Sequence, residues 1–109
     1  MTIKKNKLDK QHSESLAFLE SLAGPLTFGS MLLSIRKGEE WTQIEMAKKL
    51  KVSDKHLCDI EHERRTVSPA RASQWAKKLG YSPVTFVELA LQDLLNKDGL
   101  NLKVNVKKG

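Results

Sequence analysis

The sequence predicts an all-α domain built from five helices. Helix-capping residues recur along the chain, apolar residues within each segment return every three or four positions, and only one short stretch alternates as a strand does. A chain of 109 residues has room for one small domain with extensions. We expect a basic extension with a short helix over 1–26, the helical domain over 27–96 and a basic tail over 97–109.

Each expected helix starts at a hydroxyl side chain that can cap it. Thr27 precedes the first helix. Thr42 opens a capping box, in which its hydroxyl and the carboxylate three residues later each accept a hydrogen bond from a backbone N–H. Ser53 can cap a short third helix. Ser68 and Ser82 each precede a proline, which suits the first position of a helix because no backbone N–H is needed there.

The stretch from Thr42 to Ile60 is typical of two short helices joined by a tight turn. The small side chain of Ala47 lets the two helices approach closely, and Val52 can fill the wedge between them. The positions expected to be buried are Ile44, Ala47, Leu50, Leu57 and Ile60. This pattern predicts a bihelical helix-turn-helix, whose second helix enters the major groove of DNA.

Five segments carry a family pattern in the correct order: Gln43–Leu50, Val52–Ser53, Leu57–Glu61, Ser68–Arg71 and Ala76–Tyr81. With them the chain resembles the phage-repressor family of helix-turn-helix proteins, the Cro-like or Xre type. The resemblance covers nearly all of the expected helical domain. It implies a five-helix, lambda-repressor-like DNA-binding fold, here with an additional N-terminal helix and a strand-like C-terminal tail.

Two positions depart from the family pattern. Lys51 in the turn and Glu63 after the second helix stand where glycine is common. We expect a positive φ at both, which costs a non-glycine residue about 1 kcal/mol or somewhat more. Glu61 and Glu63 also place negative charge near the expected path of the DNA phosphates.

The resemblance implies which side chains touch DNA. Those expected to contact base edges lie at the start of the second helix of the motif and one turn further on: Ser53, Asp54, Lys55, His56 and Asp59. Those expected to contact phosphates lie at the start of the preceding helix and in the following loop: Thr42, Gln43, Arg64, Arg65 and Thr66. Lys55 suits guanine, whereas Asp59 either accepts a hydrogen bond from cytosine or orients a basic neighbour.

The formal net charge of +6 lies at the two ends of the chain. Residues 1–10 and 97–109 each carry a net +3, and residues 11–96 are neutral overall. A basic excess favours polyanionic partners, but charged ends also keep a small domain soluble. Charge alone therefore does not identify duplex DNA as the partner.

Several function classes are not expected. No apolar run approaches the roughly 18–20 residues of a membrane span, and the basic start lacks the apolar stretch of a signal peptide, so we expect a cytoplasmic protein. The lone Cys58 excludes a disulfide framework and a cysteine zinc site. His56 and His62 are six residues apart and do not form a metal-binding spacing. We expect no enzyme, no metal and no cofactor.

The tail carries the one strand-like pattern. Leu100, Leu102, Val104 and Val106 alternate with polar residues, as in a half-buried strand. A lone strand has nothing to pair with in a helical monomer. The tail is therefore expected to pair with its copy in a homodimer, to add to the sheet of a partner protein, or to be disordered.

Two functions fit these expectations. The first is a DNA-binding repressor that is dimeric on duplex DNA. The second is an antitoxin that represses its own operon and neutralises a toxin through its tail. A neighbouring gene for a short basic protein would favour the second.

Overall fold

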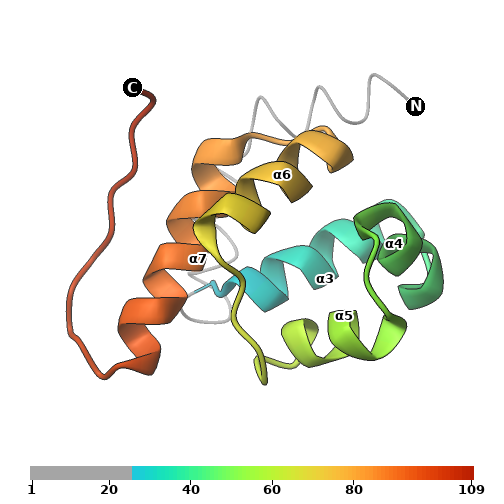
Figure 1. Ribbon diagram of the computed structural model, residues 1–109, viewed down its shortest axis with the longest axis horizontal. Helices are drawn as coiled ribbons and strands as arrows, with labels where there is room; N and C mark the ends of the chain where they lie inside the picture. The colour runs from blue at the N-terminus through green and yellow to red at the C-terminus, as the bar shows by residue number, and fades with distance from the viewer. Residues whose placement is uncertain (1–25) are drawn as a thin grey trace.

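The structure is a computed structural model, and it describes residues 26–109. Within this range the chain forms five α-helices arranged around a central α3 (Figure 1). The helices are α3 (Phe28–Gly38), α4 (Gln43–Leu50), α5 (Asp54–Glu61), α6 (Pro69–Leu79) and α7 (Pro83–Lys97). The all-α, five-helix prediction is confirmed. The helix predicted over 13–22 lies outside the described residues.

The predicted capping residues explain where the helices begin. Thr27, Thr42, Ser53 and Ser68 each accept a hydrogen bond from the backbone N–H three residues later, at 3.0 to 3.2 Å. Such a cap typically stabilises a helix by about 1 kcal/mol. Ser82 precedes α7 as expected, but its side chain makes no capping hydrogen bond.

Aromatic side chains join α3, α6 and α7 in the core. Phe28 meets Phe86 edge-on with ring centroids 5.7 Å apart, and it lies 6.4 Å from Trp75. Tyr81 stacks on Phe86 at 6.2 Å. Pairs of this geometry add to the free energy gained by burying the rings. Trp75 is buried in this core, and Trp41 packs half-buried against it.

The helix-turn-helix formed by α4 and α5 rests on α3 at a close crossing. Gly29 of α3 lies directly against the end of α5, where an added Cβ would overlap the carbonyl oxygen of Ile60. Ala47 and Val52 occupy their predicted places, buried and half-buried between the helices. The backbone of α5 therefore lies as close to α3 as a glycine permits.

One predicted core position in α4 is wrong. Ile44 is 57% exposed, and Met46 is fully buried in its place. Met46 precedes Leu50 by one helical turn and adjoins Ala47, so these three side chains share one stripe. Ile44 lies outside that stripe on the solvent side of the helix.

Among residues 26–109, three non-glycine residues adopt the left-handed conformation. The predictions for Lys51 and Glu63 are confirmed, with φ of 59° and 61°. Glu40, at φ 62°, is a third case that the sequence did not indicate. All three are exposed, so the positive φ costs conformational strain but causes no steric clash in the core.

The tail is extended but forms no strand within the described residues. After α7 the chain reverses and runs back beside that helix (Figure 1). The predicted alternation is only partly reflected in burial, because Val104 and Val106 are half-buried whereas Leu100 and Leu102 are 46% and 60% exposed. In the single chain, residues 100–106 therefore form an extended segment against a helix. Residues 100–106 are called the tail segment below.

Asp93 ties α7 to the start of α3. Its Oδ2 accepts a hydrogen bond from the backbone N–H of Phe28 at 3.1 Å. Burial raises the pKa of Asp93 to about 6, the nearby negative charge of Glu63 adds to the rise, and the hydrogen bond from Phe28 opposes it. Most of this carboxyl group is therefore ionised at neutral pH, at a cost to stability.

We predict that Asp93→Asn stabilises the protein at pH 7 and not at pH 4. A raised carboxyl pKa means that the folded state binds the proton more tightly, so this group's contribution is present below pH 4 and is lost as the pH rises through about 6. The difference is at most about 3 kcal/mol, reduced by partial exposure of the group. Denaturant unfolding of both proteins between pH 4 and 7 measures it. An equal difference at every pH would contradict the assignment.

Candidate nucleic-acid interface

A buried carboxylate holds the helix-turn-helix together. Glu61, at the end of α5, is only 6% exposed. Arg36 of α3 donates to it twice, from Nε to Oε2 at 2.8 Å and from Nη2 to Oε1 at 3.1 Å. Gln43 at the start of α4 donates from Nε2 to the same Oε1 at 2.9 Å, and Arg36 also donates to the carbonyl oxygen of Trp41 at 3.2 Å. One carboxylate therefore joins α3, α4 and α5.

This arrangement corrects the role expected for Glu61. The residue does not present free negative charge to DNA, because it is buried and paired with Arg36. The sequence did carry a signal, since Glu61 follows Leu57 by one helical turn and Ile60 by one residue and so continues their buried stripe. Gln43, predicted to contact a phosphate, is half-buried with its amide nitrogen directed to Glu61.

The start of α5 is exposed to solvent. Ser53, Asp54 and Lys55 are exposed, and His56 is half-buried. The hydroxyl of Ser53 accepts from the backbone N–H of His56 at 3.0 Å, and Oδ1 of Asp54 accepts from that of Lys55 at 3.0 Å. These two side chains therefore accept hydrogen bonds from backbone N–H groups in the first turn of α5. The side chain of Lys55 is 84% exposed and extends into solvent.

Asp59 orients two basic neighbours. Its Oδ1 accepts from Nε of Arg64 at 3.0 Å, and its Oδ2 lies 3.4 Å from Nζ of Lys55. The hydrogen bond from Arg64 is the main cause that lowers the pKa of Asp59, followed by Lys55. Nη2 of Arg64 also lies 3.6 Å from Sγ of Cys58. The sequence left two roles open for Asp59, a contact with cytosine and the orientation of a basic neighbour. The observed hydrogen bonds fit the second role.

The loop after α5 carries the other residues that were predicted to contact phosphates. Arg64 and Arg65 are exposed and Thr66 is half-buried. Partial burial lowers the pKa of His56, and the positive charges of Arg65 and Arg71 lower it further. Arg71, in the first turns of α6 and 5.8 Å from the ring of Trp75, was not among the predicted contacts. Its place in the Ser68–Arg71 segment was the available signal.

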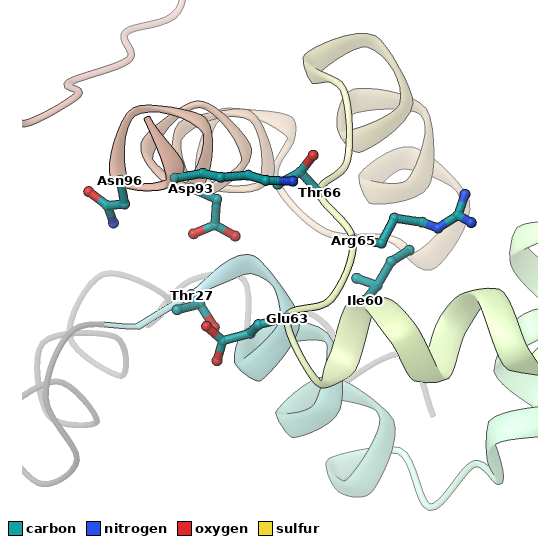
Figure 2. A pocket seen from close by; sticks show the side chains of 8 residues that line it. Thr27, Ile60, Glu63, Arg65, Thr66, Asp93 and Asn96 are labelled. Atoms are coloured by element: carbon teal, nitrogen blue, oxygen red, sulfur yellow. The ribbon is translucent and has the colours of Figure 1, made fainter. Parts of the chain in front are cut away.

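A pocket of about 310 Å³ lies behind this loop, between α7 and the start of α3 (Figure 2). Figure 2 shows the carboxyl groups of Asp93 and Glu63 on its two sides, with the guanidinium of Arg65 pointing away from Asp93. The lining residues are Thr27, Ile60, Glu63, Arg65, Thr66, Asp93, Asn96 and Lys97. The acidic groups therefore face the inner side of the loop, and the exposed arginine faces outward.

Comparison with known families decides what kind of domain this is. The family model of the helix-turn-helix domain matches residues 29–100, about two thirds of the chain. The chain belongs to this helix-turn-helix family. Neither the curated proteins nor the solved structures include a significant match to it. A helix-turn-helix domain indicates a DNA-binding regulator, and α4 and α5 of this helix-turn-helix protein are the two helices of the motif.

Two further features of the helix-turn-helix protein concern residues 26–109. None of the helices in this range is long and apolar enough to cross a membrane. The same range contains no group of three or more His, Cys, Asp or Glu side chains placed to hold a metal ion.

We predict that Glu61→Ala destabilises the helix-turn-helix protein by up to about 3–5 kcal/mol, because it leaves the guanidinium of Arg36, 15% exposed, without its counter-ion. Chemical denaturation measures the loss. Glu40→Ala is the control, since Glu40 is an exposed glutamate, and it should change the unfolding free energy by no more than about 0.5 kcal/mol. A loss below about 1 kcal/mol for Glu61→Ala would show that the pair does not hold the motif.

Proposed function

We propose that this protein is a sequence-specific repressor of the Cro-like type that binds duplex DNA as a homodimer in the cytoplasm. The observation that carries the proposal is the exposed start of α5, presented by a helix-turn-helix whose rear face is fixed to α3 through Glu61. A helix held at its far end and exposed at its start can enter a major groove without losing its place on the domain.

The proposed contacts divide into two groups. Lys55 contacts a guanine edge, because it is the most exposed cation on α5 and its ammonium group is steered by Asp59. Arg64, Arg65 and Thr66 contact phosphates from the following loop, and the N-terminus of α4 with Thr42 contacts another. Arg71 joins the phosphate contacts, because it is exposed in the first turns of α6, just after this loop.

An antitoxin is the second candidate function. It is favoured by the tail segment, where Leu100 and Leu102 expose apolar surface on an extended chain. Such a segment suits addition to a partner's sheet. In either function the chain binds DNA and has no catalytic role. Co-expression with the product of a neighbouring gene, followed by purification of the complex, separates the two.

We predict that binding to a duplex selected from a random pool weakens with salt, with the slope of log K against log salt steepening by about 0.9 for each phosphate contacted. Arg64→Ala and Arg65→Ala should weaken binding to selected and random duplexes alike. Lys55→Ala should cost roughly 1–3 kcal/mol on the selected duplex alone. Fluorescence anisotropy at several salt concentrations measures these constants.

The matched control is Lys78→Ala, which removes an exposed lysine near the end of α6 and should leave both affinities unchanged. Equal losses on selected and random duplexes for Lys55→Ala would remove this residue from the base contacts. No binding to any duplex at low salt would reject the proposed function.

We further predict that affinity for DNA rises as the pH falls from about 7.5 to about 6. The pKa of His56 is lowered in the free protein by burial and by Arg65 and Arg71. Phosphates bound to these arginines offset their charge, so the pKa rises and the complex takes up a proton. His56→Gln should remove this part of the pH dependence, whereas Asp93→Asn should retain it. Identical pH profiles for wild type and His56→Gln would be the contrary result.

A further inference from the structure

The tail segment is held on α7 through its backbone. Gln92 donates from Nε2 to the carbonyl oxygen of Leu102 at 2.8 Å, and its Oε1 accepts from the N–H of Val104 at 2.8 Å. Glu88, one turn earlier, accepts from the N–H of Val106 at 3.0 Å. The side chains of α7 thus bind main-chain groups, as the edge of a sheet would.

The spacing of these bonds follows from helix and strand geometry. Residues 88 and 92 are one turn apart on α7, about 6 Å along its axis. Residues 104 and 106 are two apart in an extended chain, about 6.6 Å, and their N–H groups point the same way. An antiparallel extended segment therefore matches the helix in register, so that the N–H groups of Val104 and Val106 reach side chains one turn apart.

The donor and acceptor atoms of α7 are already oriented for this task. Nε2 of Gln92 also donates to Oδ1 of Asn96 at 3.0 Å. This hydrogen bond orients the amide, so that its nitrogen faces Leu102 and its oxygen faces Val104. Leu91 and Leu95 lie on the same side of the helix and are half-buried. The outer α7 face, defined as Glu88, Leu91, Gln92 and Leu95, has the polar groups and the apolar surface of a peptide-binding site.

We propose that the outer α7 face is a docking site for an extended backbone, and that in the dimer its occupant is the tail segment of a second copy of this chain. The bonds with the chain's own tail transfer to a second copy without change, because the two sequences are identical. The proposal rests on the proposed homodimer and specifies how its copies are joined.

Two observations favour the second copy as the occupant. Gly99 is the hinge, since its φ of 75° reverses the chain after α7, and an extended conformation there would send the tail segment away from its own helix. The tail docked on its own helix also leaves Leu100 and Leu102 largely exposed. A partner copy can cover these side chains, which favours exchange as the protein concentration rises.

The test changes the hinge and leaves the docking face intact. Gly99→Val penalises the positive φ by strain alone, because nothing lies within 4 Å of the added Cβ. We expect the monomer–dimer equilibrium constant of the full chain, measured by sedimentation velocity, to shift roughly 30- to 900-fold toward dimer, because each of the two chains in the dimer loses strain equivalent to about 5- to 30-fold. Gly109→Val, which also adds a side chain in open space, should behave as wild type.

A second substitution tests the docking face itself. Adding Gln92→Ala to Gly99→Val should return the chain to monomer, because the two bonds to the tail backbone are lost. In a mixed sample of Gly99→Val chains, a spin label at the exposed position of Asn105→Cys, with Cys58→Ser, should broaden the amide signals of Glu88 and Gln92 in the isotope-labelled copy.

Two results would overturn the proposal. A Gly99→Val chain that stays monomeric at all concentrations shows that the site does not accept a second copy. A dimer that survives Gln92→Ala, with no broadening at α7, shows that the tails pair with each other or that another surface joins the copies. DNA binding by the same variants is measured separately, so failure of the exchange is distinguished from failure of the proposed function.

Discussion

The position of the helix-turn-helix depends on one buried charge. A carboxylate that is only 6% exposed must be paired, and Glu61 is paired by two bonds from Arg36 and one from Gln43. Its two partners belong to α3 and α4, and Glu61 itself belongs to α5, so these hydrogen bonds fix all three helices at once. Gly29 allows the backbones of α3 and α5 to meet at the same crossing. The far end of α5 is thereby held rigidly, and its capped start is left to face solvent.

The outer surface of the motif is organised by weaker interactions. Asp59 and its partners Lys55 and Arg64 are at least partly exposed, and such ion pairs contribute little to stability. These ion pairs instead position the side chains, because a carboxylate between two cations limits where each cation can reach. The region between the charged ends is neutral overall, so any attraction for DNA comes from how these groups are placed and not from an excess of them.

Local signals in the sequence were sufficient for the helices and insufficient for several side chains. Capping by Thr27, Thr42, Ser53 and Ser68 involves residues three apart, so the sequence contains the whole interaction. The burial of Met46 in place of Ile44 depends on which side of α4 meets the core, and two adjacent apolar stripes are equivalent until the helix is packed. The DNA contacts predicted at α5 and its loop remain predictions, although their exposure and charge agree with that role.

The sequence by itself determined the five helices of the described residues and their starting points, because each follows from neighbours within a few positions. The left-handed turns at Lys51 and Glu63 followed from the resemblance to the helix-turn-helix pattern. Only the tertiary structure decided the roles of Glu61, Asp93 and Gln92. Glu61 meets Arg36 across 25 positions, Asp93 meets Phe28 across 65, and Gln92 meets Val104 only after the chain has reversed. A carboxylate or amide side chain is chemically the same at the surface and in the core. Its role depends on which partner it meets, and the packing of the helices determines that partner.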